Sequence, residues 1–326
     1  MTSKSQASPS SNIQEAFFPV QMRSSFVDTS NNGDGSSTKR VDKFRAIIDV
    51  ERDNVFAVVT AKYKLVTNQQ AYEMSKNVMH RVFKVIKLED LKCLYVHMPS
   101  TRSFCHIDLI HRGMNFTLPT RSDDGWTAFL RITNSYNRTK KLSFELGFCR
   151  WICDNKMIFG SKSVTFSDAH TKEGGLRMEK FIDNLGEIGR IEASFIAQMD
   201  SLRSIPIQQD ALLPLACRVF GFDDPPNKIV SAKDKKKRRL VEMRDAIRLA
   251  GDRYYRELDA TGYAAMNVLT DYATRPGPER ELDVHELQRK SGDWIDEFTR
   301  IVRNPGFNLG EYLAPYQATA SAIAEL

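Results

Sequence analysis

The sequence has few cysteines and no long apolar run. It contains 326 residues with five cysteines, and this odd number favours reduced thiols and a cytosolic setting over a disulfide framework. No apolar run approaches the roughly 18 residues that a membrane span needs, and the polar N-terminus lacks the apolar stretch of a signal peptide. We therefore expect a cytoplasmic protein without a membrane partner.

The sequence also lacks the short motifs of common enzyme classes. It has no Gly-x-Ser-x-Gly elbow, no phosphate-binding Gly-x-x-x-x-Gly-Lys loop and no dinucleotide-binding Gly-x-Gly-x-x-Gly. The acidic pairs Asp123-Asp124 and Asp223-Asp224 stand beside glycine or proline, where turn residues are expected. We therefore predict no catalytic residue and no cofactor.

Histidines and cysteines are densest between residues 93 and 111. Zinc could be held there by four ligands from two neighbouring strands, but the spacing matches none of the short zinc signatures. We favour ordinary sheet positions and assign no metal. The residues in question are Cys93, His97, Cys105, His106 and His111.

The positive charge is unevenly placed. The chain has 47 Lys and Arg against 41 Asp and Glu, a net charge of +6, and residues 233–256 alone hold ten basic and four acidic residues. Five of these cations fall in the first two turns of a predicted helix, where the macrodipole disfavours each by about 0.3–1 kcal/mol. We infer an anionic partner, nucleic acid before other acidic molecules, with a solvated surface or an import signal as alternatives. The five are Lys235, Lys236, Lys237, Arg238 and Arg239.

The hydrophobic patterns predict an α+β protein, with a mostly antiparallel sheet and packed helices in the N-terminal half and a helical C-terminal half. We expect a flexible tail over 1–39, in which residues 16–20 are apolar enough to dock, a core domain over 40–225 and a helical region over 226–326. The predicted strands cover 44–50, 55–60, 92–98, 103–111, 114–118, 127–134 and 141–152. The predicted helices cover 68–86 with Asn68 as N-cap, 176–203, 209–220, 231–258 with a Ser231/Asp234 capping box, 262–274 and 282–303.

A second basic region lies on the predicted sheet. Residues 102–150 contain eight basic and four acidic residues interleaved with aromatic ones, a composition typical of surfaces that stack bases and track phosphates of a single strand. Aromatic side chains on strands are also common in cores, which is the alternative. We expect the turn at 134–140 to be the most exposed part. The candidate contacts are Arg131, Tyr136, Arg138, Lys140, Lys141 and Arg150.

Four segments, 61–68, 130–136, 148–157 and 267–272, resemble in order the motifs of the domain of unknown function 932 family. These motifs read Tyr-x-x-Val-x-Asn, Asn-Ser-Tyr, Arg-x-x-Cys-x-Asn and Asn-x-x-Thr-Asp-Tyr. The chain departs from them at Lys156 and at Asn137-Arg138, where the family often has glycine. The motif residues are Tyr63, Asn68, Asn134, Ser135, Cys153, Asn155, Asn267, Thr270 and Asp271.

The resemblance implies a role in the DNA metabolism of phages, plasmids or integrated elements, on which family members occur. Together with the basic regions it leads to the hypothesis of a non-enzymatic protein, a candidate homo-oligomer, that binds single-stranded DNA in recombination, annealing or replication. The alternative is a protein-interaction module that engages or blocks a host defence protein. In that case, replacing the five cations at 235–239 with glutamine leaves activity in the cell intact.

Overall fold

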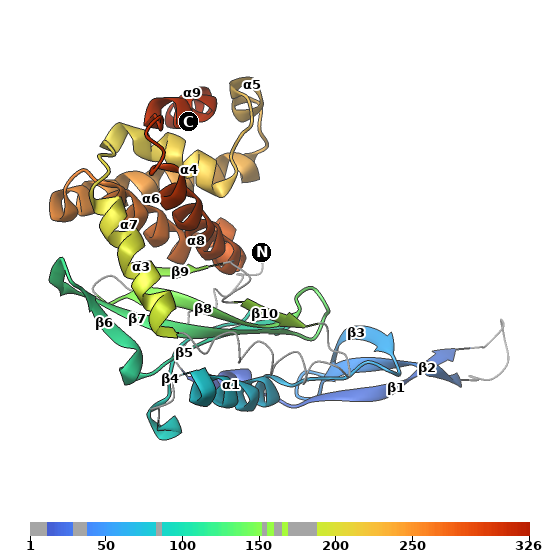
Figure 1. The fold of residues 1–326 in the computed structure, drawn as a ribbon. Coiled ribbons are helices and arrows are strands. Elements are labelled where there is room, and N and C mark those ends of the chain that lie inside the picture. The colour runs from blue at the N-terminus through green and yellow to red at the C-terminus, as the bar shows by residue number, and fades with distance from the viewer. Residues whose placement is uncertain (1–11, 29–37, 83–86, 152–154, 160–164, 169–187) are drawn as a thin grey trace. The chain divides into compact units, whose positions relative to one another are not determined.

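The computed structural model describes residues 12–28, 38–82, 87–151, 155–159, 165–168 and 188–326 (Figure 1). Antiparallel sheets occupy the N-terminal half of the chain and helices the C-terminal half, which confirms the predicted α+β class. The chain forms two units. The first comprises residues 1–113, 129–145 and 165–186, and the second comprises residues 114–128, 146–164 and 187–326.

These units differ from the predicted domains, which placed a boundary at residue 225. Two long strands, β7 (Arg121–Ser135) and β8 (Leu142–Arg150), each begin in one unit and end in the other. A boundary drawn from composition along the chain cannot find such a division, because each unit is assembled from separate segments.

The first unit contains most of the strands. In chain order its elements are η1 (Ile13–Ala16), β1 (Val20–Asp28), β2 (Thr38–Asp49), β3 (Asn54–Thr60), α1 (Asn68–Val82), η2 (Leu88–Asp90), β4 (Lys92–His97), β5 (Phe104–Ile110) and β10 (Thr165–Asp168), with η3 (Arg112–Met114) at the end of its first segment. A small sheet has the order β1-β2-β3, and a larger one has the order β10-β8-β7-β5-β4.

The predicted strands at 44–50 and 55–60 are present in β2 and β3, which form a hairpin and pair antiparallel on either side of a four-residue turn. The carboxylate of Asp49 accepts hydrogen bonds from the backbone N–H groups of Glu51 and Arg52 at 3.1 and 3.2 Å. Asp53 takes a left-handed backbone conformation with φ 49°. Aspartate both caps such turns and tolerates this conformation, which explains the charged turn sequence.

The N-terminal segment contains more regular structure than the sequence indicates. Residues 13–28 form η1 and β1, so the flexible-tail prediction is wrong for this part, while residues 1–11 and 29–37 lie outside the described residues. Phe18 and Val20 are buried against Ile47 and Val59. The expected docking of residues 16–20 is therefore confirmed, and it brings β1 alongside β2.

Helix α1 begins at the predicted residue but with a different cap. The hydroxyl of Thr67 accepts the Gln70 N–H at 3.1 Å, and the Gln70 side chain accepts the Thr67 N–H at 2.9 Å. This reciprocal pair is a capping box. Thr67 therefore caps the helix, and the side chain of Asn68 is left for contacts elsewhere in the unit.

The second unit contains two short strands and most of the helices. Its elements are β6 (Asn115–Leu118), β9 (Asn155–Ile158), α3 (Ile188–Arg203), η4 (Gln209–Ala211), α4 (Leu212–Phe220), α5 (Pro226–Val230), α6 (Asp234–Leu258), α7 (Gly262–Thr274), η5 (Pro278–Asp283), α8 (Val284–Ile301) and α9 (Leu309–Ala324). Strand β6 pairs with β7 and β9 pairs with β8, both antiparallel. Within the described residues no helix is both long and apolar enough to cross a membrane.

Most of the predicted helices are present, and α7 has the predicted bounds. Part of the predicted helix at 176–203 lies outside the described residues. Helix α6 ends as predicted but begins at Asp234, because Ser231 ends α5 and donates its hydroxyl to the Asn227 carbonyl at 2.7 Å. The predicted Ser231/Asp234 capping box is therefore wrong. Helices α5 and α9 were not predicted.

An aromatic cluster forms part of the core of the second unit. The rings of Phe148 and Phe195 are stacked with their centroids 4.1 Å apart, and Trp126 lies edge-on to Phe195 at 5.0 Å. Phe116 and Phe159 contact the same rings edge-on. The aromatic residues of β7 and β8 in this unit therefore serve packing, which was the alternative to base stacking.

Candidate nucleic-acid interface

Arg131 lies in a buried ion pair, not on the surface. It donates two hydrogen bonds to the Asp108 carboxylate, from Nε at 2.6 Å and from Nη2 at 2.7 Å, and both side chains are buried. A guanidinium held in this bidentate way is not available to a phosphate. Arg131 is therefore corrected from a predicted nucleic-acid contact to a link between β5 and β7.

Arg150 is also buried, in a polar network of the second unit. Its Nε donates to Asp124 at 2.7 Å, and its other nitrogens donate to Asn267 and Glu257, each at 3.2 Å. Tyr263 donates its hydroxyl to the same Asp124. The prediction that Arg150 contacts phosphate is therefore wrong too, because its guanidinium is buried and bonded to groups of the protein.

Tyr136 was expected to be exposed, and that expectation is wrong. Its ring is stacked on Phe56 at 5.3 Å and lies edge-on to Phe18 at 5.7 Å. Its hydroxyl accepts the backbone N–H of Asn68 at 2.8 Å. Burial raises the pKa of this hydroxyl well above its ordinary value. Tyr136 therefore packs the hairpin between β7 and β8 against the buried face of the small sheet.

The tip of that hairpin does carry exposed cations. Arg138 and Lys141 are exposed, and Lys140 is half-buried with its ammonium 4.9 Å from the centre of the Phe104 ring. The hydroxyl of Ser135 donates to the Lys140 carbonyl at 2.7 Å and accepts the Lys140 N–H at 3.1 Å, which closes the hairpin. Arg138 has φ 64°, a conformation that glycine adopts most easily, so the turn geometry explains the glycine usual in the family.

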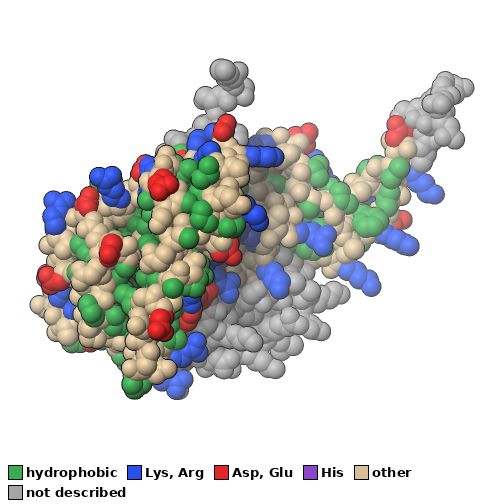
Figure 2. All heavy atoms as spheres, turned by 90° about the horizontal axis from the view of Figure 1, so that it is seen from above, with side chains coloured by type: hydrophobic (Ala, Val, Ile, Leu, Met, Phe, Trp, Pro, Cys, Tyr) green, Lys and Arg blue, Asp and Glu red, His purple; other side chains and the backbone are tan. Residues whose placement is uncertain are grey.

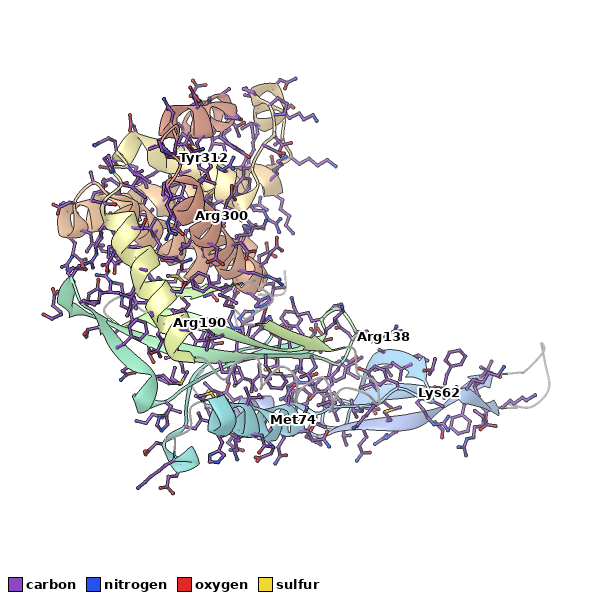
Figure 3. All side chains as sticks on the ribbon, viewed as in Figure 1. Lys62, Met74, Arg138, Arg190, Arg300 and Tyr312 are labelled. Carbon is purple, nitrogen blue, oxygen red and sulfur yellow. The ribbon has the colours of Figure 1, made fainter. Side chains whose placement is uncertain are left out.

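Two further basic segments, 60–64 and 38–46, were not among the predicted contacts; the first lies close to this tip, and the second pairs with the first at residues 43 and 44. Lys43 accepts the backbone N–H of Ala61 at its carbonyl, at 2.9 Å, and Phe44 pairs with Thr60 across β2 and β3. The charge of Arg138 acts on the nearby Tyr63 hydroxyl, opposing the burial that raises its pKa to about 12. Figure 3 labels both Arg138, at the hairpin tip, and Lys62, beside the small sheet. We call residues 38–46, 60–64 and 136–141 the hairpin–arm surface.

The hairpin–arm surface is strongly positive. Its three segments contain nine basic residues and one acidic residue, a net charge of +8, which exceeds the +6 of the whole chain. Figure 2 shows lysine and arginine side chains beside hydrophobic ones on the small sheet. Six exposed cations of this surface form no ion pair with any residue that the structure describes. They are Lys39, Lys43, Lys62, Lys64, Arg138 and Lys141.

The basic start of α6 has acidic neighbours, by contrast. Lys236 pairs with Asp224 at 2.5 Å and Arg238 pairs with Glu279 at 3.0 Å. The hydrogen bond from Arg238 lowers the pKa of Glu279 below its ordinary value. Within the described residues, Lys235 and Lys237 form no ion pair. The cost of placing cations at a helix start is therefore partly offset inside the protein, which weakens the inference of an external anion there.

Two motif residues of the first unit, Asn68 and Asn134, form a buried hydrogen-bond network. Asn134 donates to the Val66 carbonyl and to the Asn68 side chain, both at 2.9 Å. Asn68 in turn donates to the Ala16 carbonyl at 3.0 Å. This network fixes the N-terminal segment, the start of α1 and the end of β7 to one another.

The motif residues of the second unit form a similar network around β9. Asn155 donates to the Tyr254 hydroxyl at 2.9 Å and to the Asn267 carbonyl at 3.0 Å. Asp271 accepts hydrogen bonds from Arg253 and Arg275, and Thr270 donates to the backbone one turn earlier in α7. Cys153 lies outside the described residues. In both units the motif asparagines thus link segments that are far apart in the sequence.

The histidines of β4 and β5 occupy buried sheet positions. The rings of His97 and His106 are stacked 6.1 Å apart, and His106 shares a 2.8 Å hydrogen bond with the Thr133 hydroxyl. Burial, reinforced by the charge of Arg131, lowers the pKa of His97 to about 4, so this side chain is neutral near pH 7. Within the described residues no three His, Cys, Asp or Glu side chains gather as a metal site would require.

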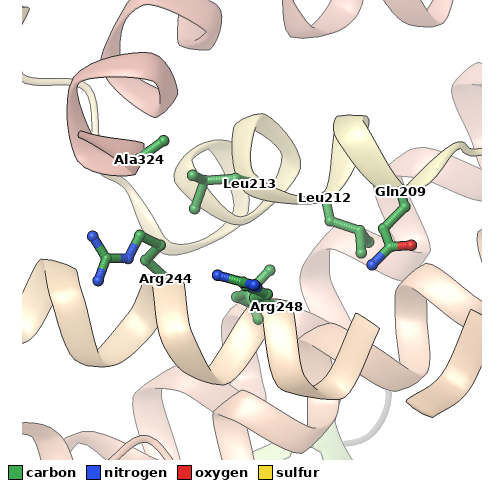
Figure 4. Close-up of a pocket in the computed structure, with 7 residues that line it drawn as sticks. Gln209, Leu212, Leu213, Arg244, Arg248 and Ala324 are labelled. Carbon is green, nitrogen blue, oxygen red and sulfur yellow. The ribbon is translucent and has the colours of Figure 1, made fainter. Parts of the chain in front are cut away.

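The second unit also contains a pocket of about 430 Å³ between α4, α6 and the end of α9 (Figure 4). Leu212 and Ile247 contribute buried apolar surface, and Arg244 and Arg248 lie one turn apart on α6. Arg244 is held by Asp245 at 2.8 Å. The seven lining residues include no carboxylate, histidine, cysteine or serine, so the pocket offers shape and positive charge but no group for acid–base or nucleophilic chemistry.

Comparison with known proteins gives one family. The family model described as "Domain of unknown function (DUF932)" matches residues 55–294. This range contains all four motif segments. It also contains two of the three segments of the hairpin–arm surface completely, 60–64 and 136–141. No curated protein and no solved structure matches the chain.

Proposed function

The chain belongs to the domain of unknown function 932 family, and because that description names no activity, we propose from the site itself that the protein binds nucleic acid, single-stranded DNA in particular. The hairpin–arm surface is the contact. The observation that carries this proposal is its content of nine basic residues against one acidic residue. Such a surface attracts polyphosphates and releases their counterions on binding.

The position of these cations favours a single strand. They lie on a sheet, in the irregular segment that follows β3 and on a hairpin tip, and not along one face of a helix that could enter a major groove. The start of α6 is a second and weaker contact through Lys235 and Lys237. We place the activity in recombination, annealing or replication of a mobile element, a context that rests on the family resemblance.

A salt titration tests the proposal. We expect a fluorescently labelled 20-nucleotide single strand to bind more tightly than the corresponding duplex, with an affinity that falls steeply as salt increases. If about five phosphates are contacted, the slope of log affinity against log salt is about −3.5 for a single strand. No binding at low salt, or binding that is independent of salt, would refute the proposal.

Charge substitutions locate the contact. The variant K43Q/K62Q/K64Q removes three exposed cations of the hairpin–arm surface, so it should make the salt slope shallower by about 2. The control K76Q/K87Q/K92Q changes the net charge equally on other parts of the first unit and should leave the slope unchanged. Equal effects of the two variants would point to net charge alone, and no effect of either would favour the protein-interaction alternative.

A further inference from the structure

Exposed apolar side chains are concentrated on the small sheet. Among the described residues, nine large hydrophobic side chains are exposed, and five of them belong to β1–β3. Exposed apolar residues that occur singly need no explanation, but a cluster on one sheet indicates a binding surface. The five are Phe26, Val27, Phe44, Val55 and Val58.

The strand register places Phe44 and Val58 on the outer face of this sheet. Phe44 pairs with Thr60, and Ala46 pairs with Val58 on one side and with Arg23 on the other. Because side chains alternate along a strand, Ile47 and Val59 point to the opposite face, where they are buried. The outer face is solvent-exposed, with 43% of Phe44 and 55% of Val58 accessible.

Charge decides what this face accommodates. Arg23 is exposed and lies in the same cross-strand row as Ala46 and Val58, and the exposed Lys62 stands two residues after Thr60, the partner of Phe44. A second copy of the chain would bring the same cations against these, at a cost in like-charge repulsion. A nucleic-acid strand supplies both complements, because its bases are flat and apolar on their faces and its backbone is anionic.

We propose that the face around Phe44 is a base-stacking platform for an unpaired nucleic-acid strand, with Phe44 in contact with a base and the cations Arg23 and Lys62 in contact with phosphates. This inference rests on the proposed function and specifies how the surface distinguishes unpaired from paired strands. The bases of a duplex are stacked on one another and cannot reach the ring. Phe44 therefore determines specificity, whereas the surrounding cations determine overall affinity.

An abasic strand separates the two contributions. We compare wild type and Phe44→Ala for binding to a 20-nucleotide thymidine strand and to an abasic strand of the same length and charge, at one salt concentration. Loss of one stacking contact should weaken binding of the thymidine strand by about 5- to 150-fold. Binding of the abasic strand should change by less than about 2-fold. The control Leu249→Ala removes an apolar side chain that is 75% exposed in the second unit and should affect neither strand.

The outcomes are distinguishable. If Phe44→Ala weakens both strands equally, or neither, the platform is refuted while the proposed function stands. If neither strand shows salt-dependent binding to wild type, the proposed function itself fails. Should Phe44→Ala not fold, Phe44→Trp decides instead. This variant should bind the thymidine strand at least as tightly as wild type, with an additional change in tryptophan emission that the abasic strand does not produce, and absence of that change refutes the platform.

Discussion

Replacing Arg131 with methionine should reduce stability without reducing nucleic-acid affinity. Methionine fills much of the same space but cannot donate the two hydrogen bonds that Asp108 accepts at 2.6 and 2.7 Å. The carboxylate is fully buried, so it would remain in the interior without a counter-charge. Removing one partner of a buried pair in this way costs about 3–5 kcal/mol. That is a large part of the roughly 5–15 kcal/mol that holds a typical domain folded.

Urea unfolding measures this loss. With a denaturant slope of about 2–3 kcal/mol per molar, the midpoint of Arg131→Met should fall by about 1–2.5 M. The double variant D108N/R131M buries a neutral amide in place of the stranded carboxylate and should recover part of the stability. The recovery is incomplete because Glu145, a buried carboxyl that also interacts with the Arg131 charge, loses that interaction in both variants.

The comparison with Arg138→Met makes the test decisive. Arg138 is exposed on the hairpin–arm surface, so its replacement should change the unfolding free energy by less than about 0.5 kcal/mol and should weaken binding of a single strand. The reasoning fails if Arg131→Met unfolds at the wild-type midpoint, or if it folds normally and binds DNA more weakly. Equal destabilisation of the single and double variants would also contradict it, because the buried charge would then not be the cause.

Two further predictions concern packing and pH. Gly292→Ala should lower the unfolding free energy by about 1–3 kcal/mol, because the new Cβ would stand 2.1 Å from the Ile158 carbonyl oxygen. Gly189→Ala, where a Cβ meets nothing within 4 Å, is the control, and equal urea midpoints would contradict the prediction. The pKa of His97 is about 4 when folded against 6.5 ordinarily, so the unfolded chain takes up a proton first as the pH falls. The unfolding free energy should therefore decrease between pH 6.5 and 4 by up to about 3 kcal/mol. His97→Phe should flatten this decrease and the exposed His80→Gln should not; parallel curves for the two variants would refute it.

Features set by neighbouring residues were predictable from the sequence. The β2–β3 hairpin follows from alternating apolar residues around a charged turn, and α7 follows from a helical period between two breaks. The start of α6 was misplaced because two local signals competed. Ser231 reads as an N-cap from sequence alone, yet its hydroxyl binds backward to Asn227 and ends the preceding helix.

The site was less predictable, because exposure depends on partners far away in the sequence. Arg131 is paired with Asp108, 23 residues earlier, and Tyr136 contacts Asn68, 68 residues earlier. The predicted turn at 134–140 favoured exposure of Arg138, but nothing in the sequence around Arg131, in a predicted strand, shows that it has a buried partner. A second signal was present for Arg138. The family usually has glycine at this turn, and a non-glycine residue with positive φ is confined to a tight, solvent-facing turn more often than to a core.

The distribution of charge also ranks the hairpin–arm surface above the start of α6 as a contact for nucleic acid. Outside residues 233–256 the chain appeared balanced, because 37 basic and 37 acidic residues average to zero over some 300 positions. The fold brings together, within the first unit, three segments that hold nine of those cations and one of those anions, which averaging along the chain cannot reveal. At the start of α6 the fold does the reverse and brings Asp224 and Glu279 to the cations. A phosphate arriving there must compete with bound carboxylates, whereas six exposed cations of the hairpin–arm surface form no ion pair with any residue that the structure describes. Neutralising Lys43, Lys62 and Lys64 should therefore weaken binding of a single strand more than neutralising Lys235, Lys236 and Lys237, although each change removes three charges.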